Sequence, residues 1–234
     1  MRAFQQAGVN LPHSAAAQSG FGKSISFGSL KPGDFLVVMG TVSPVAIKEL
    51  GKKLSTFGVH LVDAPVSGGD VGAKNGTLSI MVGGSVDEFN TLKPIFEKIG
   101  STVKHLGPLG AGEMAKACNQ IVVAVTLSAL AEAVTLGRKA GLDTKTLLDI
   151  LAGGLANSQV LNVKREKIES GDFTPGGSAD FQLKDIRFAL EAGASTGTYL
   201  PTTETVKNEQ VHEIGRRVKN FFSRRYKIPH SCIR

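Results

Sequence analysis

The sequence contains no tryptophan and only two cysteines, Cys118 and Cys232, in 234 residues. The cysteines form no CxxC pair and no metal-ligand spacing, which argues against a disulfide framework and against a cysteine-based zinc site. A reducing compartment is the simplest interpretation. With 41% hydrophobic and 20% charged residues, the composition is that of a soluble globular protein of one large or two small domains.

Long apolar runs are also missing. The stretch IVVAVTLSALAEAV (residues 121–134) is shorter than the ~20 residues that a membrane span needs, and Glu132 interrupts it. We therefore expect a soluble, intracellular protein without a membrane partner, most simply a cytoplasmic one.

Acidic residues are absent from both ends of the chain. Residues 1–33 hold no Asp or Glu and five serines, which resembles a transit peptide although arginine is scarce; a mitochondrial or plastid protein is the alternative. Residues 216–234 hold seven basic and no acidic residues, while the other residues carry 20 of each sign. The net charge of +7 therefore lies in the tail, which we expect to be solvated rather than a nucleic-acid arm. Base stacking by FFSRRY within it is the alternative.

The first elements form a β-α-β unit. Residues 35–39 (FLVVM) are predicted to be a buried strand, and Ser43 and Pro44 suit the N-cap and first position of a helix that Gly58 ends. Apolar residues recur in this helix at helical spacing: Ile47, Leu50, Leu54 and Phe57. Residues 59–66 (VHLVDAPV) are the next predicted strand, which implies parallel strands and a right-handed crossover.

The alternation continues for one more unit. Residues 77–84 and 101–107 are predicted strands, and a helix between them begins with a capping box of Ser85 and Glu88. Pro94 within that helix is predicted to kink or split it.

From Gly112 onward the pattern is helical, beginning with one segment of about 29 residues. Further helices are predicted at residues 144–154, 158–171 and 178–193. Strands followed by helices indicate an α/β part and then an all-α part, with a boundary near residues 107–112.

Two places could carry chemistry. In DAPVSGGD (residues 63–70), Ser67, Gly68 and Gly69 follow a strand, and the glycines let either a ligand or a neighbouring turn come close. Near the start of the long helix, Lys116, Asn119 and Gln120 share one face.

That face continues as an apolar stripe: Val123, Leu127, Leu130 and Val134. One interpretation is that the first turns simply emerge into water. The other is a site, since the glycine-rich GPLGAG before it leaves room for a ligand. The positive end of the helix dipole also disfavours an ammonium at Lys116, which makes it a candidate proton donor or acceptor.

Three segments together resemble the β-hydroxyacid dehydrogenases, which include 3-hydroxyisobutyrate dehydrogenase and tartronate semialdehyde (2-hydroxy-3-oxopropionate) reductase. They are DAPVSGGDVGAKNGTLSIMVGG, GPLGAGEMAKACNQ and FQLKDIRFALEAG, and the resemblance covers residues 29–205. It implies part of a Rossmann-like NAD(P)-binding domain (residues 29–109) and a helical domain of the 6-phosphogluconate dehydrogenase type for substrate and dimer contacts (residues 110–205). Residues 1–28 and the basic residues 206–234 fall outside it.

The resemblance also implies roles for residues of this chain. Ser67, Gly68 and Gly69 would hold the carboxylate of a small substrate, as backbone N–H groups and a hydroxyl suit an anion. Lys116 would be the general acid/base of hydride transfer to or from NAD or NADP, and Asn119 and Gln120 would orient the substrate. Many relatives carry Asn at the position of Gln120.

Two further residues would contact the cofactor, namely Thr41 and Lys184. From its sequence context alone, Thr41 would be a residue at a helix start, and Lys184 would be a solvated lysine of a helix.

No G-x-G-x-x-G turn occurs in the sequence, although the family places the cofactor diphosphate on one. We therefore expect a chain truncated at its N-terminus, with impaired cofactor binding. The expected function is reversible oxidation of a small 3-hydroxy acid or reduction of a semialdehyde acid, by a homo-oligomer formed through the helical domain. The alternative is an inactive fragment that acts only by assembling with full-length relatives.

Overall fold

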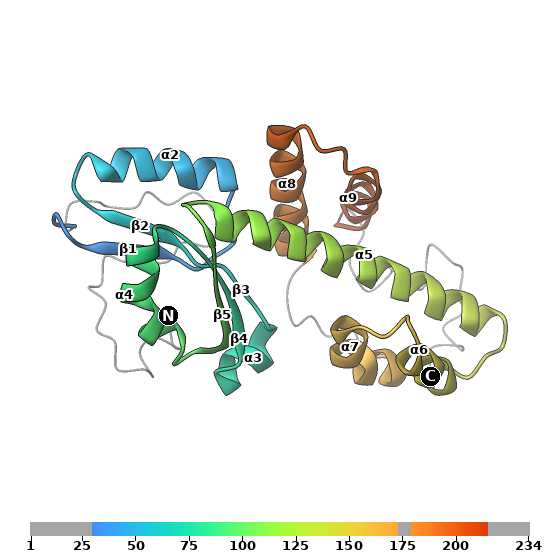
Figure 1. Ribbon diagram of the computed structural model, residues 1–234. Coiled ribbons are helices and arrows are strands. Elements are labelled where there is room, and N and C mark those ends of the chain that lie inside the picture. Colours follow the sequence, from blue (N-terminus) through green and yellow to red (C-terminus); the bar gives the residue numbers. More distant parts are fainter. Residues whose placement is uncertain (1–29, 173–178, 215–234) are drawn as a thin grey trace. The chain divides into compact units, whose positions relative to one another are not determined.

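The computed structural model describes residues 30–172 and 179–214, which divide into two compact units (Figure 1). Unit 1 comprises the described residues up to Asn119 together with Glu191–Thr198, and unit 2 comprises Gln120–Leu190 and the residues from Tyr199. The first unit contains the sheet and the second is helical, so the predicted succession of α/β and all-α parts is confirmed. The predictions for the serine-rich start and the basic tail lie outside the described residues.

A five-stranded sheet forms the centre of unit 1. Its strands are β1 (Phe35–Val38), β2 (His60–Asp63), β3 (Val66–Ser67), β4 (Leu78–Gly83) and β5 (Gly100–Gly107). β1 pairs with β2 in parallel, as the β-α-β pattern predicted, and β4 pairs with β5 in parallel. β4 runs antiparallel to β2 and β3, so the sheet is mixed rather than parallel throughout.

The predicted strand over residues 59–66 is interrupted at Ala64 and Pro65, which separate β2 from β3. The connection from β3 to β4 is residues 68–77 with the short helix α3 (Gly69–Asn75). A parallel crossover needs a dozen or more residues, so this connection returns the chain antiparallel.

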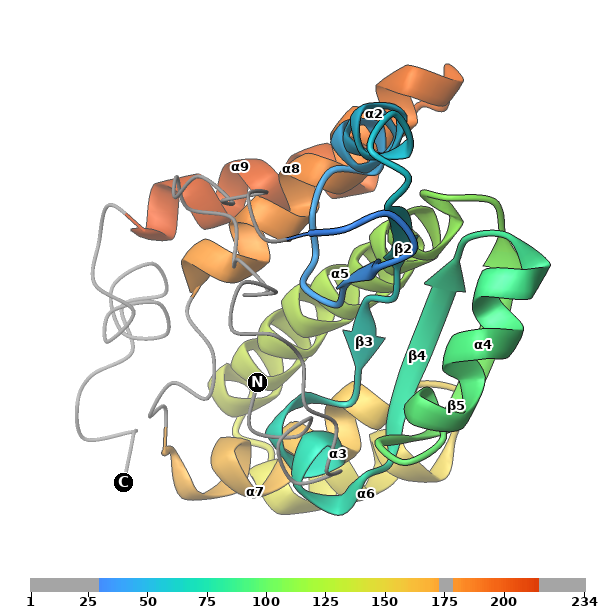
Figure 2. The same ribbon diagram turned by 90° about the vertical axis from the view of Figure 1, so that its left-hand side faces the viewer.

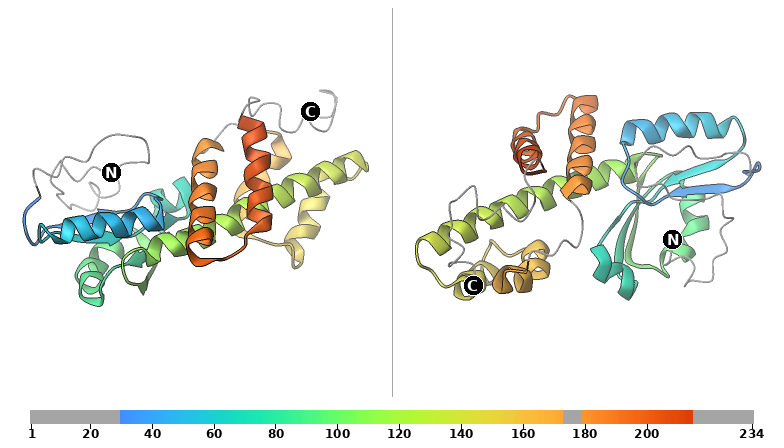
Figure 3. Two further views of the ribbon diagram at one scale, coloured as in Figure 1. Left: turned by 90° about the horizontal axis from the view of Figure 1, so that it is seen from above. Right: turned by 180° about the vertical axis from the view of Figure 1, so that it is seen from behind.

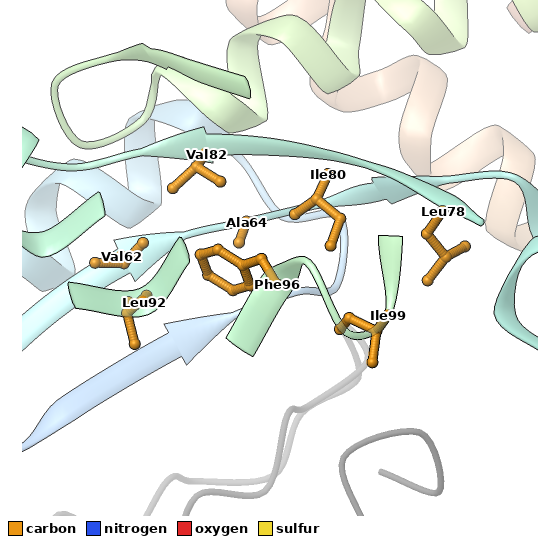
Figure 4. Close-up of a cluster of buried hydrophobic side chains, with 8 residues drawn as sticks. All are labelled: Val62, Ala64, Leu78, Ile80, Val82, Leu92, Phe96 and Ile99. Atoms are coloured by element: carbon orange, nitrogen blue, oxygen red, sulfur yellow. The ribbon is translucent and has the colours of Figure 1, made fainter. Parts of the chain in front are cut away.

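Helices cover both faces of the sheet, as Figure 1 and Figure 2 show. α2 (Pro44–Ser55) packs on the face that presents Leu36 and Leu61. α4 (Val86–Phe96) packs on the opposite face, which presents Val62. Adjacent residues of β2 thus point into different cores, as the pleat of a strand requires. Figure 4 shows the core beneath α4, where Phe96 contacts apolar side chains from β2 and β4.

The predicted helix signals hold with two corrections. Ser43 caps α2 by accepting the N–H groups of Val45 and Ala46, and Ser85 and Glu88 form the predicted capping box of α4. Pro94 does not split α4, which ends two residues later. Phe57, expected in the apolar stripe of α2, is 67% exposed because the helix already ends at Ser55.

Unit 2 is built around α5, a helix that begins in unit 1 and has the predicted 29 residues (Figure 3). Its helices are α5 (Ala111–Lys139), α6 (Thr144–Gly153), α7 (Gln159–Ser170), α8 (Ala179–Thr196) and α9 (Pro201–Ile214). Leu130 and Val134 of α5 pack with α6 and α7, while Ala124 packs with Ile186 of α8 and Val206 of α9.

By length and composition alone, α5 could cross a membrane. The expectation that no segment would be long enough is wrong by this criterion. The core helix of a soluble protein passes the same test, so this property alone is a weak indication of a membrane.

Glu88 connects α4 to the sheet. Its carboxylate accepts the N–H of Ser85 at 2.7 Å and lies 3.0 Å from Nδ1 of His60 in β2. Burial opposes ionisation, but these hydrogen bonds prevail and hold the pKa of Glu88 below its ordinary value of 4.5. A carboxyl with a lowered folded-state pKa stabilises the fold above its unfolded-state pKa, and that stabilisation is lost as the pH falls through the folded-state pKa.

We expect Glu88→Gln to lower the free energy of unfolding at pH 7 by about 1 kcal/mol, as for the loss of a helix cap. The deficit should shrink as the pH falls below 4.5, the ordinary pKa. Urea denaturation of both proteins from pH 7 to pH 3 measures this. Asp87→Asn, an exposed change in the same helical turn, is the control and should show less than half the deficit. A deficit for Glu88→Gln that stays constant with pH would contradict the linkage.

Candidate functional site

The start of α5 is held by a side chain from the sheet. Asp63, the last residue of β2, accepts the N–H of Gly110 on Oδ1 and the N–H of Glu113 on Oδ2, both at 2.7 Å. The side chain is fully buried. The first N–H groups of a helix lack intrahelical acceptors, so Asp63 caps α5 from a distant part of the sequence.

Burial raises the pKa of Asp63 above its ordinary value, although the backbone N–H groups of Gly110 and Glu113 act in the opposite direction. Desolvation disfavours the ionised carboxylate, whereas the N–H donors favour it.

Glu113 connects the same helical turn to a second strand end. Its side chain is 1% exposed, and Oε2 accepts the N–H of Val42 at 3.2 Å. Val42 lies in the loop between β1 and α2, next to Thr41, which the resemblance placed beside the cofactor. The first turn of α5 is therefore bonded to the end of β2 and to the loop that follows β1.

Lys116 reaches a third strand. Its Nζ donates to the backbone carbonyl of Val66 at 2.8 Å, and the residue is only 8% exposed. The interpretation in which these turns simply emerge into water therefore does not hold for Lys116. Val66 directly precedes Ser67, so Lys116 Nζ lies next to the start of the serine-glycine turn.

The turn after β3 is open to solvent at its glycines. Ser67 is half-buried, whereas Gly68 and Gly69 are exposed and have φ values of 131° and 60°. Such angles are strained for other residues. A Cβ at Gly69 would meet nothing within 4 Å, whereas one at Gly68 would lie 3.2 Å from Leu78. The turn thus leaves free space on one side, where an anion could meet backbone N–H groups.

Two other predicted residues share a partner within unit 2. Gln120 Nε2 donates to Asp185 Oδ2 at 2.6 Å, and Lys184 Nζ lies 3.1 Å from Asp185 Oδ1. Lys184 is also 5.4 Å from the ring centroid of Phe188. Lys184 is therefore engaged rather than a plain solvated lysine. Asn119, the last residue of unit 1 on α5, is half-buried.

Sequence reasoning missed Asp63, Glu113 and Asp185. One signal was available, because GPLG (residues 107–110) offers no Ser, Thr, Asp or Asn to cap a 29-residue helix. A missing local cap indicates that the acceptor comes from elsewhere in the chain.

The arrangement in unit 1 combines a buried ammonium, a hydroxyl and an open glycine turn. Such a set can bind a small anion and move a proton at a neighbouring oxygen. Within the described ranges, no group of three or more His, Cys, Asp or Glu residues could hold a metal ion.

Two family descriptions match consecutive parts of the chain. Residues 11–107 match the NAD binding domain of 6-phosphogluconate dehydrogenase, and residues 110–218 match the NAD-binding domain of NADP-dependent 3-hydroxyisobutyrate dehydrogenase.

Individual relatives agree with these matches. The chain is 39% identical to 2-hydroxy-3-oxopropionate reductase of Escherichia coli, over 76% of the chain and 60% of the relative. It is 40% identical to 2-(hydroxymethyl)glutarate dehydrogenase of Eubacterium barkeri, over 80% and 62%. The chain thus spans about three fifths of the length of these relatives.

A solved structure shares the fold. The 3-hydroxyisobutyrate dehydrogenase of Mycobacterium tuberculosis, solved with L-serine, superposes with a TM-score of 0.75 at 29% identity, over 86% of this chain and 72% of that one. The motifs, both domain matches and this superposition agree that the chain is similar to the β-hydroxyacid dehydrogenases in both of its parts.

Proposed function

We propose that the protein transfers hydride reversibly between NAD or NADP and a small 3-hydroxy acid or semialdehyde acid. The observation that carries the proposal is the hydrogen bond from Lys116 Nζ to Val66 O, at 2.8 Å, beside the Ser67–Gly69 turn. The names of two relatives, 2-hydroxy-3-oxopropionate reductase and 2-(hydroxymethyl)glutarate dehydrogenase, support this class of substrate.

In this mechanism the turn binds the substrate carboxylate through the Ser67 hydroxyl and the N–H groups of Gly68 and Gly69. Lys116 gives a proton from Nζ to the carbonyl oxygen during reduction and takes it back during oxidation. Asn119 and Gln120 orient the remaining polar groups of the substrate. The hydride itself comes from, or goes to, the nicotinamide.

The described residues fit the nicotinamide end of the cofactor better than its diphosphate. Thr41 lies in the loop at the carboxyl end of β1, where α/β sheets bind ligands, and Lys184 is the residue proposed to reach the cofactor from unit 2. No G-x-G-x-x-G turn occurs in the 234 residues to hold a diphosphate.

Exposed apolar side chains support association through the helical unit. They include Val122, Leu136, Ile150 and Leu155, with exposed fractions of 64%, 71%, 72% and 108%. Several large apolar side chains exposed on one unit can mark a subunit contact. We propose a second copy of the chain as the partner. Association with a full-length relative is the alternative for a chain without activity.

Replacing Lys116 by Ala should lower turnover by about 10²–10⁴-fold, the usual contribution of a general acid. The assay uses NADH and NADPH with small semialdehyde acids. It is run on the chain and on a chimera that joins residues 30–234 to the amino-terminal part of the E. coli reductase. Lys98→Ala, an exposed lysine of unit 1, is the control and should stay within twofold of the parent.

The outcomes separate the two candidate functions. A Lys116→Ala chimera that keeps its rate would remove the lysine from the mechanism. A parent chimera that reduces none of these acids with either cofactor would leave only the assembly function.

The chain alone should bind NADPH weakly, because the diphosphate lacks its glycine-rich turn. Fluorescence titration should show no saturation at micromolar NADPH, whereas the chimera should saturate there. Micromolar binding by the chain alone would contradict the proposed impairment.

Sedimentation should give a dimer or larger species that Leu136→Glu shifts toward monomer, since a charge disfavours burial of this site. Phe57→Glu, at an equally exposed apolar residue of unit 1, should leave the sedimentation coefficient unchanged. A chain that is monomeric at all concentrations would overturn association through the helical unit.

A further inference from the structure

α5 obtains its position from two carboxylates that the proposed chemistry does not use. Asp63 supplies acceptors for the N–H groups of Gly110 and Glu113, and Glu113 supplies one for Val42. Both carboxylate side chains are almost completely buried. The bonds of Asp63 join the first turn of α5 to the end of β2, and the bond of Glu113 joins it to the loop after β1.

Two glycines make room for Asp63. A Cβ at Gly83 of β4 would lie 2.3 Å from Asp63 Oδ1, and one at Gly112 would lie 2.9 Å from Oδ2 and 2.2 Å from the carbonyl of Met81. Real Cβ atoms essentially never come so close to another heavy atom. The start of α5 can therefore approach β2 and β4 closely because Gly83 and Gly112 have no side chain. This close packing leaves the carboxylate of Asp63 little freedom to move.

Lys116 depends on this arrangement through a short segment of chain. Asp63 anchors the start of α5, and only Ala64 and Pro65, both buried, lie between it and Val66, which accepts the bond from Lys116. Helix and strand are thus joined at two points, one helical turn apart on α5. A shift of α5 at the first point would move the ammonium relative to Ser67, and displacements of about 1 Å can cost 10²-fold in rate.

We propose that Asp63 and Glu113 are positioning residues. They fix the first turn of α5 against the sheet, so that Lys116 Nζ lies next to the Ser67 turn and the loop that contains Thr41 stays close to the start of α5. The catalytic meaning of this inference rests on the proposed function, whereas its geometric content does not. The residues themselves touch no substrate in this scheme.

Asp63→Asn tests the proposal with little change of shape. The amide keeps one acceptor but turns an N–H group toward the second backbone N–H, so one capping bond is lost. We expect the amides of Gly110 and Glu113 to exchange with deuterium roughly fivefold to tenfold faster, the scale of one lost cap. Competitive acetylation should label Lys116 faster by a similar factor, relative to exposed Lys98 in the same sample.

Asp143→Ala is the matched control, because alanine offers no acceptor, whereas an asparagine amide would keep one. Asp143 caps α6 in unit 2 by accepting the N–H of Thr146 at 2.8 Å. This variant loses one capping bond of a different helix and should leave the exchange of Gly110 and the labelling of Lys116 unchanged. Equal effects of the two variants on Lys116 would mean that general destabilisation explains them, which would overturn the proposal.

In the chimera, Asp63→Asn should lower kcat about tenfold or more while KM for NADPH stays within twofold, as expected for a displaced proton donor. Faster labelling of Lys116 in an inactive chimera would support the positioning role and refute the proposed function. Unchanged labelling, together with loss of activity in Lys116→Ala, would support the function and refute the positioning role.

If Asp63→Asn does not fold, amide hydrogen exchange of the unmodified protein tests the proposal instead. Amides of Gly110 and Glu113 that exchange as slowly as those of the interior of α5 support the inference, since the first turn of an uncapped helix frays. Amides that exchange like those of an exposed loop overturn it.

Discussion

The structure of unit 1 depends on the bond between a strand-end carboxylate and a helix start. A helix as long as α5 presents several N–H groups without acceptors at its first turn, and leaving these buried and unbonded is costly. Asp63 resolves this from 50 residues away in sequence. Because the bond lies at the carboxyl edge of the sheet, it places the polar face of α5 above the turn that follows β3.

Two opposing effects act on the pKa of Asp63. Desolvation disfavours charge on Asp63 and raises its pKa, whereas the N–H donors of α5 favour the charge. Three residues further along α5, Lys116 is held by geometry, since its Nζ donates to the backbone carbonyl of Val66 at 2.8 Å. In the mechanism that we propose, Lys116 held in this way gives its proton to a carbonyl oxygen placed over the glycine turn.

Much of the fold follows from local patterns. The period of the apolar residues gave the helices and strands, and Ser43, Ser85 and Glu88 gave helix starts that local hydrogen bonds enforce. The antiparallel course of β4 was missed because it depends on the length of the connection after β3, although the presence of Pro65 could have indicated the break in the preceding strand. Phe57 was misplaced because α2 was expected to continue up to Gly58, whereas it ends at Ser55.

The site was predictable to a similar extent. Spacing on one helix placed Lys116, Asn119 and Gln120 together, and the glycines after a strand drew attention to Ser67. The resemblance added Thr41 and Lys184. The partners of these residues could not be derived in this way, because the contacts of Asp63 with α5 and of Gln120 with Asp185 join segments 50 and 65 residues apart. Such pairs follow from tertiary packing rather than from periodicity.

The most direct measurement of the central claim is a crystal structure of the protein soaked with 3-hydroxypropionate, a minimal 3-hydroxy acid. The account predicts that the carboxylate lies on the hydroxyl of Ser67 and the N–H groups of Gly68 and Gly69. It also predicts that Lys116 Nζ lies within hydrogen-bond distance of the ligand hydroxyl. A ligand bound to the turn with Lys116 directed elsewhere, or a ligand bound only away from both, would contradict it.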